Sequence, residues 1–406
     1  MNYQETVDWM FRQLPMYQRQ GRTAFKKDLH NTIKLADYLG NPEKDFKSVH
    51  VGGTNGKGST SHILASILHE AGYRVGLYTS PHLKSFRERI RINGEEVDEE
   101  FVVNFVEAHK NYLEDNSLSF FEMTVGMAFQ YFSVNRVDIA IIEVGLGGRL
   151  DSTNIIIPEV SVITNIGFDH VQFLGNTYEA IAIEKAGIIK KNVPVVIGET
   201  HPKTKVVFED KSNEQQTEIY FADQLIHENL ESDLKGIYQK YNVKTALQTI
   251  NILKNRNFNV TGEDIGIGLN NVSRNTGLKG RWQILGTRPK IICDTGHNRE
   301  ALVYIFNQLR TEAFDTLHIV FGVVNDKDVS VILPIMPKNA IYYFCKPDIP
   351  RGMESKKLQS IFQSEGFEGE AYKSVDKALV AAKKRASKRD LIFIGGSTFV
   401  VAEIIE

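Results

Sequence analysis

Residues 49–60 read Val-His-Val-Gly-Gly-Thr-Asn-Gly-Lys-Gly-Ser-Thr. A short β-branched run leads into four glycines around Lys57, and residues 59–71 then place apolar side chains at three- and four-residue spacing. This order predicts a strand, a glycine-rich turn and a helix. Backbone N–H groups of such a turn curl around phosphate oxygens, the helix N-terminus adds a favourable dipole, and a lysine adds a mobile positive charge.

The turn departs from a strict P-loop signature at both ends. That signature needs glycine at position 51 and Ser or Thr at position 58, where this chain has Val51 and Gly58. A glycine-rich turn can also exist only because a strand and a helix pack closely. The lysine in a strand-turn-helix context favours phosphate binding, so we expect the phosphates of ATP to bind here.

Short β-branched runs alternate with helical patterns along the chain, which is typical of crossover connections and a mostly parallel sheet. In the first half the predicted strands are 48–51, 74–78, 138–143, 160–164 and 193–197, with a second helix at 178–190. We therefore predict an α/β protein whose first domain is built on a P-loop-type, mostly parallel sheet.

The chain of 406 residues is too long for one growing core, so a second domain is expected. The alternation breaks at residues 209–216 and 270–280 and resumes at 291–294. We predict an ATP-binding domain over 1–285 and a smaller, Rossmann-like α/β domain over 286–406. The strands expected in the second are 317–321, 340–344 and 391–394, and the helices are 299–310, 355–365 and 375–387.

The composition of the chain limits which binding partners and which cellular compartment are expected. The 48 basic and 50 acidic side chains nearly cancel, so net charge favours neither nucleic acid nor an anionic membrane. Cys293 and Cys345 are too few for a disulfide framework and lack metal-ligand spacing, which indicates a reducing compartment. The first residues lack the pattern of a secretory signal, and no apolar run has membrane-spanning length. We expect a cytoplasmic monomer.

Carboxylates and other polar groups follow two predicted strands. Glu143 ends the strand at 138–143, and ligands of open parallel sheets bind outside the carboxyl ends of strands. Glu143 should therefore lie beside the phosphate loop, where Mg²⁺ accepts hard oxygen ligands. A strand-terminal glutamate is as often a solvated residue at the sheet edge.

Asp169 and His170 follow the strand at 160–164, at the same predicted sheet edge. Such a pair more often caps a turn than binds metal, but its place beside the loop and Glu143 favours a site. Lys185 falls within the helix predicted at 178–190. From the residues alone, it is an ordinary ion-pairing lysine.

Several segments together resemble the folylpolyglutamate synthase and dihydrofolate synthase family, which belongs with the Mur ligases by its Gly-Thr-x-Gly-Lys loop. The matching segments are 53–59, 78–83, 143–154, 169–170, 184–188, 280–282, 294–298 and 395–397. They extend over nearly the whole chain.

The resemblance implies the roles of individual residues. The ATP-binding positions are Asn55, Gly56, Lys57, Gly58, Ser59, Asn242, Arg281, Asp294 and His297. Magnesium would be held by Ser80, Glu143 and His170. Lys185 matches a lysine that the family carries as a CO₂-derived carbamate, and a buried lysine loses its proton more easily, which permits that reaction. Catalysis would then depend on Lys57, Glu143, His170 and Lys185.

The resemblance also implies which residues bind the acceptor and the incoming glutamate. Positions that match dihydropteroate-binding residues of bifunctional members are Ser119, Leu150, Asp151 and Ser152. Arg89 matches an arginine assigned to the incoming glutamate, although an isolated arginine is usually a surface ion-pairing residue. Residues 24–28 read Ala-Phe-Lys-Lys-Asp, where the bifunctional members carry Ile-Asp-Leu-Gly.

These observations predict an ATP-dependent ligase that adds L-glutamate to dihydropteroate, reduced folates or both through an acyl phosphate. One alternative is a cell-wall amino-acid ligase, but those enzymes carry an extra domain before the loop. Here about fifty residues precede it, fewer than a domain usually needs to fold unaided. A second alternative is a nucleotide-regulated binding protein without ligase chemistry.

Overall fold

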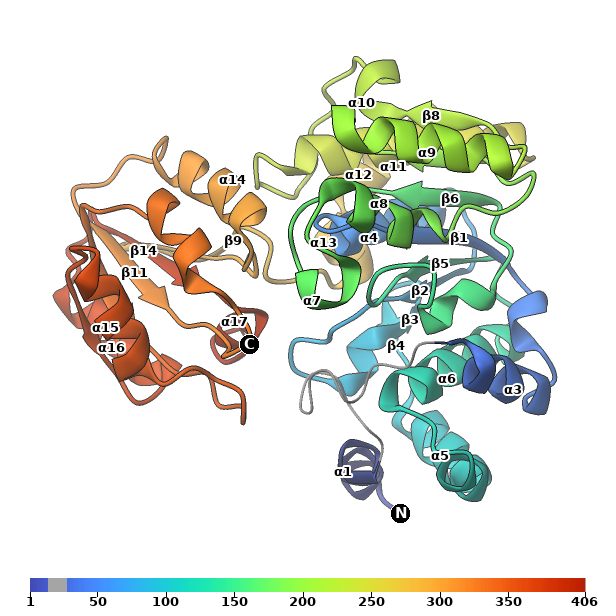
Figure 1. Ribbon diagram of the computed structural model, residues 1–406, viewed down its shortest axis with the longest axis horizontal. Coiled ribbons are helices and arrows are strands. Elements are labelled where there is room, and N and C mark those ends of the chain that lie inside the picture. The colour runs from blue at the N-terminus through green and yellow to red at the C-terminus, as the bar shows by residue number, and fades with distance from the viewer. Residues whose placement is uncertain (14–27, 406) are drawn as a thin grey trace. The chain divides into compact units, whose positions relative to one another are not determined.

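The computed structural model describes residues 1–13 and 28–405, and Figure 1 shows its helices and strands. Residues 24–27 of the segment that departs from the family pattern lie outside the described ranges. The chain divides into two compact units. Unit 1 contains Met1–Asp233 and Gln239–Gly277, and unit 2 contains Leu234–Tyr238 and Leu278–Glu406. The boundary expected at 285/286 falls inside the unit 2 strand β9 (Gln283–Thr287).

Unit 1 is built on an eight-stranded sheet of order β4-β3-β2-β5-β1-β6-β7-β8. Its parallel strands are β1 (Lys47–Gly52), β2 (Val75–Tyr78), β5 (Ile139–Glu143), β6 (Val160–Ile163), β7 (Val195–Ile197) and β8 (Ile219–Phe221). Two short antiparallel strands, β3 (Ile90–Ile92) and β4 (Glu95–Glu96), extend one edge. The five strands predicted for this half are confirmed. β3, β4 and β8 have three residues or fewer and were not predicted.

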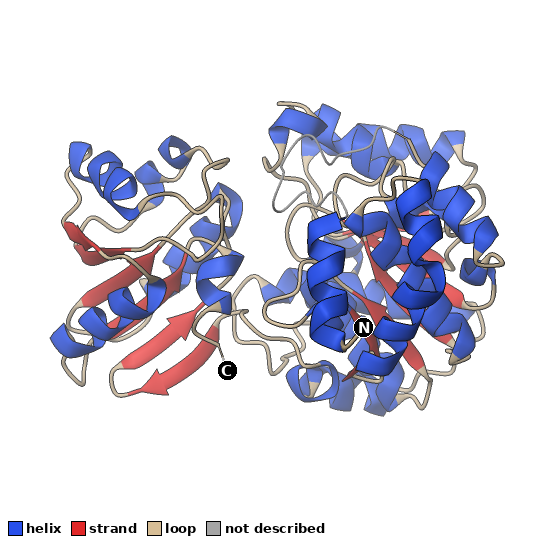
Figure 2. Cartoon of the chain, turned by 90° about the horizontal axis from the view of Figure 1, so that it is seen from below, coloured by secondary structure: helices blue, strands red, loops and turns tan. Residues whose placement is uncertain are grey.

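Helices cover both faces of this sheet, as Figure 2 shows. On one face, α4 (Lys57–Glu70) contacts β1, β2 and β5, while α11 (Gln239–Asn255) contacts β6 and β7. The other face is covered by α6 (Phe120–Val134), α8 (Tyr178–Ala186) and α9 (Pro202–Glu214). Because both faces are covered, all five residues of β5 are buried, as parallel sheets require.

The remaining helices of unit 1 extend these layers. They are α1 (Tyr3–Gln13), α3 (His30–Tyr38), α5 (Glu99–Asp115), α7 (Val171–Leu174), α10 (Ala222–Leu225), α12 (Gly262–Asn270) and α13 (Val272–Thr276). Helices α12 and α13 pack on α4, and α3 packs on α6.

Helix α8 ends before the predicted residue 190. The carbonyl of Glu184 accepts a hydrogen bond from Arg149 N (2.8 Å), so Ile188 N bonds to Lys185 O instead (3.2 Å). The chain therefore leaves the helix at Gly187. Ile188 and Ile189 are buried in a loop, and their burial accounts for the longer helical pattern in the sequence.

Unit 2 is a smaller α/β unit with a six-stranded sheet of order β13-β12-β11-β14-β10-β9. Strands β10 (Lys290–Cys293), β11 (Leu317–Phe321), β12 (Ala340–Phe344), β13 (Gly369–Ala371) and β14 (Leu391–Gly395) are parallel, and β9 is antiparallel to β10. Its helices are α14 (Arg299–Leu309), α15 (Ser355–Ser364), α16 (Val375–Arg385) and α17 (Thr398–Ala402). The strands and helices predicted for this half are confirmed within a few residues at their ends.

No helix among the described residues combines the length and the apolar character needed to cross a membrane.

Candidate active site

The phosphate loop joins β1 to α4 at the carboxyl edge of the unit 1 sheet. In the strand register, Val51 pairs with Glu143 of β5 and Gly52 pairs with Ile163 of β6. The ends of three neighbouring strands therefore meet at the loop, as the sequence predicted. Helix α4 begins at Lys57, and the first N–H groups of a helix have no partner within it. These N–H groups include those of Lys57, Gly58 and Ser59.

Two residues after β6 brace this loop. Asn165 accepts from Thr54 N at its main-chain oxygen and from Asn55 N at Oδ1 (both 2.9 Å). Thr164 Oγ1 donates to Asn55 O (2.6 Å). Thr164 and Asn165 were not predicted as site residues. Their polar side chains directly after a buried strand were the only signal in the sequence.

Two glycines give the loop its shape. A Cβ on Gly53 (φ +138°) would lie 1.9 Å from Thr164 Oγ1, and a Cβ on Gly56 (φ +83°) would lie 2.2 Å from Asn242 Oδ1. Both glycines are required by positive φ and by close approach. The second contact also brings Asn242, a predicted nucleotide residue on α11, against the loop.

The predicted metal ligands come from three segments that follow strands. Glu143 is 4% exposed at the end of β5, and its Oε2 accepts from Ser80 N (3.2 Å) after β2. His170 follows β6 in a left-handed conformation (φ +49°), with its N–H bonded to Asp169 Oδ1 (2.8 Å). Glu143 is buried, which excludes the alternative of a solvated residue at the sheet edge.

A hydroxyl, a carboxylate and an imidazole form a donor set that a divalent cation accepts. Within residues 1–13 and 28–405, no three His, Cys, Asp or Glu side chains are grouped closely enough to hold a metal ion. A cation bound at this edge would therefore use Ser80 and non-protein oxygens in addition to Glu143 and His170.

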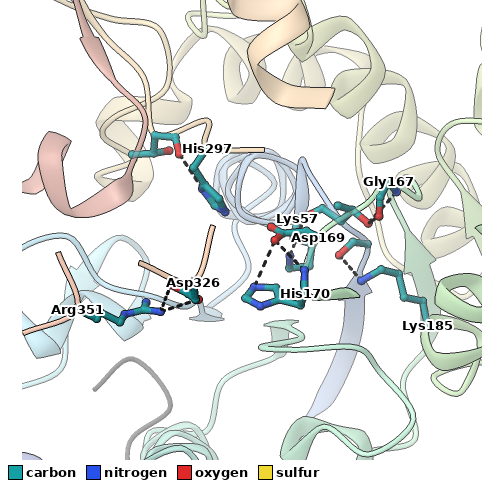
Figure 3. Close-up of polar contacts among 11 residues, drawn as sticks. Lys57, Gly167, Asp169, His170, Lys185, His297, Asp326 and Arg351 are labelled. Carbon is teal, nitrogen blue, oxygen red and sulfur yellow. Dashed lines mark hydrogen bonds and ion pairs between the residues drawn. The ribbon is translucent and has the colours of Figure 1, made fainter. Parts of the chain in front are cut away.

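Lys185 is 4% exposed on α8, and its Nζ donates to Gly53 O of the phosphate loop (2.8 Å). Figure 3 shows this side chain pointing toward the loop backbone. Burial and then the charge of Lys57 lower the pKa of Lys185 to about 7, against the opposing attraction of Asp169 and Asp151. The structure therefore differs from the simplest sequence interpretation, an ordinary ion-pairing lysine.

The predicted acceptor residues have structural contacts of their own. Asp151 is buried and accepts from Leu146 N (2.8 Å) and from Thr153 N (3.0 Å), which fixes the loop after β5. Burial raises its pKa, although these hydrogen bonds oppose the shift. Ser119 caps α6 in a reciprocal pair with Glu122. Ser152 is buried beside Asp151, and Leu150 is half-buried.

Arg89 is 2% exposed, so it is not a surface residue. Its Nε donates to His82 Nδ1 (2.7 Å), and its guanidinium lies 5.2 Å from the centre of the Phe120 ring. Burial lowers the pKa of Arg89. Burial, with the charge of Arg89, also holds the pKa of His82 well below its usual value.

The other predicted nucleotide residues lie in unit 2. Asp294, at the end of β10, is buried and accepts from Tyr238 OH (2.5 Å), from Trp282 N and from Gly296 N (both 2.8 Å). Arg281 Nη1 hydrogen bonds to Thr295 Oγ1, and His297 Nδ1 lies 3.0 Å from Thr295 O. Burial raises the pKa of Asp294, against its hydrogen bonds and the charge of Arg281. These three residues surround the loop that follows β10.

Comparison with known families matches both units. The Mur ligase middle domain matches residues 51–263, and the Mur ligase glutamate ligase domain matches residues 280–398.

Two curated relatives align with almost all of this chain. A "Dihydrofolate synthase/folylpolyglutamate synthase" of Bacillus subtilis is 30% identical over 99% of this chain and 98% of the relative. A "Probable bifunctional folylpolyglutamate synthase/dihydropteroate synthase" of Haloferax volcanii is 32% identical over 99% of this chain. The chain spans about half (50%) of the length of that second relative.

The same likeness holds in three dimensions. A solved structure of a bifunctional folylpolyglutamate synthase/dihydrofolate synthase with Mn, AMPPNP and L-glutamate bound has a TM-score of 0.85. It shares 28% sequence identity and covers 100% of this chain and 97% of its own.

Proposed function

This chain belongs to the folylpolyglutamate synthase/dihydrofolate synthase family of Mur ligases, and from that premise we propose that it is an ATP-dependent glutamate ligase. It joins L-glutamate to dihydropteroate, to reduced folates or to both. The observation that carries the proposal is the meeting of the phosphate loop, Glu143 and Lys185 at one edge of one sheet. That arrangement supplies what phosphoryl transfer to a carboxylate needs: N–H groups that donate hydrogen bonds to phosphate, a carboxylate ligand for a cation, and a fixed charge.

In the first step, a carboxylate oxygen of the acceptor attacks the γ-phosphorus of ATP. A new P–O bond forms, the bond to the β-phosphate oxygen breaks, and ADP leaves. The N–H groups at the start of α4 and the ammonium of Lys57 stabilise the negative charge that spreads over the transferring group. Because the hydrogen bonds that Thr54 N and Asn55 N donate to Asn165 hold the loop in shape before ATP binds, little reorganisation is needed during transfer.

In the second step, the amine of glutamate attacks the acyl carbon, the C–O bond to phosphate breaks, and inorganic phosphate leaves with the bonding electron pair. The amine loses a proton as the amide forms. Neither step needs a nucleophile from the protein. The chain contributes by holding the two substrates in line, which converts a bimolecular encounter into a positioned reaction.

A divalent cation, Mg²⁺ in our proposal, would be held by Glu143, His170 and the hydroxyl of Ser80. When bound, it supplies charge that neutralises phosphate oxygens. The structure similar to this chain contains Mn and AMPPNP together. The fit here rests on the buried carboxylate of Glu143, which accepts a hydrogen bond from the main-chain N–H of Ser80 and so lies beside that residue at the carboxyl edge of the sheet.

We also propose that Lys185 is carbamylated. Its lowered pKa leaves a large neutral fraction at neutral pH, and the neutral Nζ attacks the carbon of CO₂. Starting from the ammonium, Nζ first loses one proton, the N–C bond forms as one C=O π bond of CO₂ opens, and a second proton then leaves the nitrogen. A cation is thereby replaced by an anion beside Lys57. Protein equilibrated with carbon-13-labelled bicarbonate should show a carbamate resonance that is missing from Lys185→Ala. Labelled wild-type protein that is active but lacks this resonance would disprove the modification.

On the substrate side, we propose that Ser119, Leu150, Asp151 and Ser152 surround the pterin portion of the acceptor and that Arg89 binds the incoming glutamate. Their support is the match to family positions together with burial near the loop after β5. The proposed acceptor site therefore extends from the phosphate loop toward α6.

The test is ADP release measured with dihydropteroate or a reduced folate, each with and without L-glutamate. We expect release to depend on an acceptor and product to appear only with glutamate. Hydrolysis that ignores both substrates would favour a nucleotide-regulated binding protein. Activity only with a cell-wall peptide precursor would favour the other branch of the Mur ligases.

A further inference from the structure

Arg89 is a buried cation whose direct contacts are with neutral groups. Its side chain is 2% exposed, and the groups at its guanidinium are the His82 ring, the Phe120 ring and the buried Tyr78. The carboxylates of Glu88 and Glu143 attract it, but they do not offset its burial, because the pKa of Arg89 remains lowered. A buried charge of this kind is strongly destabilising unless an anion joins it. The site is therefore suited to a carboxylate that arrives with a substrate.

His82 determines which face of the guanidinium such a carboxylate can use. An arginine offers two pairs of parallel N–H groups, one at the side through Nε and one at the end through both Nη atoms. The Nε–H is already donated to His82 Nδ1 at 2.7 Å. Only the end-on pair is left, and the accepting ring nitrogen carries no proton of its own.

The surroundings hold His82 in this role. Its ring lies 6.2 Å from the Phe11 ring and 6.5 Å from the Phe86 ring, centre to centre. Two residues earlier, Ser80 N donates to Glu143 Oε2 at the sheet edge. One short segment therefore connects the arginine to the phosphate side of the site.

We propose that His82 is a positioning residue for glutamate binding, which fixes Arg89 so that its two Nη atoms receive a carboxylate of L-glutamate end-on. The proposal rests on the proposed function, because it assumes that Arg89 meets the incoming glutamate. It adds a residue and a binding geometry that determine affinity for glutamate without contact with the reacting atoms.

The test uses two substitutions of nearly equal size, His82→Asn and His82→Leu. The Asn Oδ1 occupies the place of Nδ1 and still accepts from Arg89, whereas Leu fills the space without an acceptor. For each variant, KM for L-glutamate, KM for ATP, kcat and thermal unfolding are measured in the ADP-release assay. Loss of one hydrogen bond to a charged group should raise KM for glutamate about tenfold in His82→Leu. In His82→Asn it should stay within about twofold, with KM for ATP unchanged in both.

Arg89→Ala and the double variant Arg89→Ala/His82→Leu complete the cycle. If His82 acts through Arg89, His82→Leu adds nothing to KM for glutamate once Arg89 is gone. Equal effects of Asn and Leu, or a full effect of Leu in the Arg89→Ala background, would overturn the proposal and leave the ligase function intact. An unchanged KM for glutamate in Arg89→Ala would remove its premise. Wild-type protein without glutamate-dependent product would instead contradict the proposed function itself.

Discussion

Polar residues are buried at an edge of each sheet in this chain. At one edge a buried cation faces another cation, and at the other each buried polar group has hydrogen-bond partners. At the carboxyl edge of the unit 1 sheet, Lys185 donates to one main-chain oxygen, and the nearby cation Lys57 repels it. At the amino edge of the unit 2 sheet, His318 lies between Tyr343 OH (3.0 Å) and Asp390 Oδ2 (3.2 Å). Asp390 also accepts from Ser387 N and Thr316 N.

This difference in surroundings indicates which buried residues serve activity and which serve the stability of the fold. A buried network in which each partner is satisfied makes the fold rigid and is destabilising when one member is lost. Buried charges that repel each other destabilise the fold, so they persist where a ligand or a reaction uses them. Substitutions at the carboxyl edge should therefore reduce activity more than stability, and those at the amino edge should do the reverse.

The largest effect is expected from Lys57→Ala and Glu143→Gln. In the proposed mechanism both residues act on charge that develops during phosphoryl transfer, so kcat should fall by about 10²–10³-fold or more in each variant. The thermal midpoint should stay close to that of the wild type. Turnover and unfolding are measured on the same preparations. Wild-type turnover in either variant would remove that residue from the mechanism.

Lys185→Ala should reduce turnover by about 10–100-fold, because it removes the group that we propose supports the metal and phosphate geometry. A small carboxylic acid added to the assay should restore part of the activity if the missing group is an anion. Lys190→Ala is a matched control, since that lysine also has a pKa lowered by burial but bonds to Asn154 O instead of the loop. Equal losses in both variants would contradict a specific role for Lys185.

Lys185 should also make stability depend on pH. Its pKa is near 10.5 in the unfolded chain and about 7 in the folded chain, so between these values the unfolded state binds the extra proton. The free energy of unfolding therefore increases as pH rises from 7 to 10.5, by up to about 1.4 kcal/mol per pH unit. Lys185→Met should be more stable than the wild type below pH 7, and this advantage should shrink through that window. The measurement is denaturant unfolding with CO₂-free buffers, and an advantage that is constant with pH would contradict it.

At the amino edge of unit 2, Asp390→Ala should lower the free energy of unfolding by about 2–4 kcal/mol and leave KM values unchanged. Burial alone would raise the pKa of Asp390, but hydrogen bonds from Ser387 and His318 outweigh it and the net shift is downward. Its stabilisation is therefore present above pH about 4 and is lost as pH falls through the folded value.

The control for Asp390 is Asp315→Ala, which removes an exposed ion pair with Arg389. We expect a change below about 1 kcal/mol there. If Asp390→Ala instead reduced turnover while stability held, the distinction between the two edges would fail.

The smallest effect tests a residue with two assigned roles. Ser119→Ala should lower stability by about 1 kcal/mol, because its hydroxyl accepts from Glu122 N at the start of α6. Ser374→Ala removes the same kind of cap from α16 and is the matched control. A rise in KM for the acceptor in Ser119→Ala alone would add binding to its structural role. Equal KM values in both variants would leave Ser119 as a cap only.

Local pattern determined much of this protein. The sequence of residues 49–60 was enough to predict a strand, a turn and a helix, because glycine spacing and apolar periodicity are visible within a few residues. Strands buried on both faces read as continuous apolar runs, so β5 and β11 were found without reference to their neighbours. The proposed metal and nucleotide positions came from local pattern at the loop and Glu143 and otherwise from family resemblance, and those of unit 1 follow strands at one sheet edge or contact the loop there.

Tertiary structure alone decided the rest, because burial and pairing depend on residues distant in the chain. Nothing in the sequence near Arg89 shows that it is buried against Phe120, or that its Nε–H donates a hydrogen bond to His82. The early end of α8 follows from a hydrogen bond given by Arg149, 35 residues before Glu184. Lys185 has the pattern of a surface lysine, and only the fold places it against Gly53 O, where desolvation brings its pKa close to neutrality.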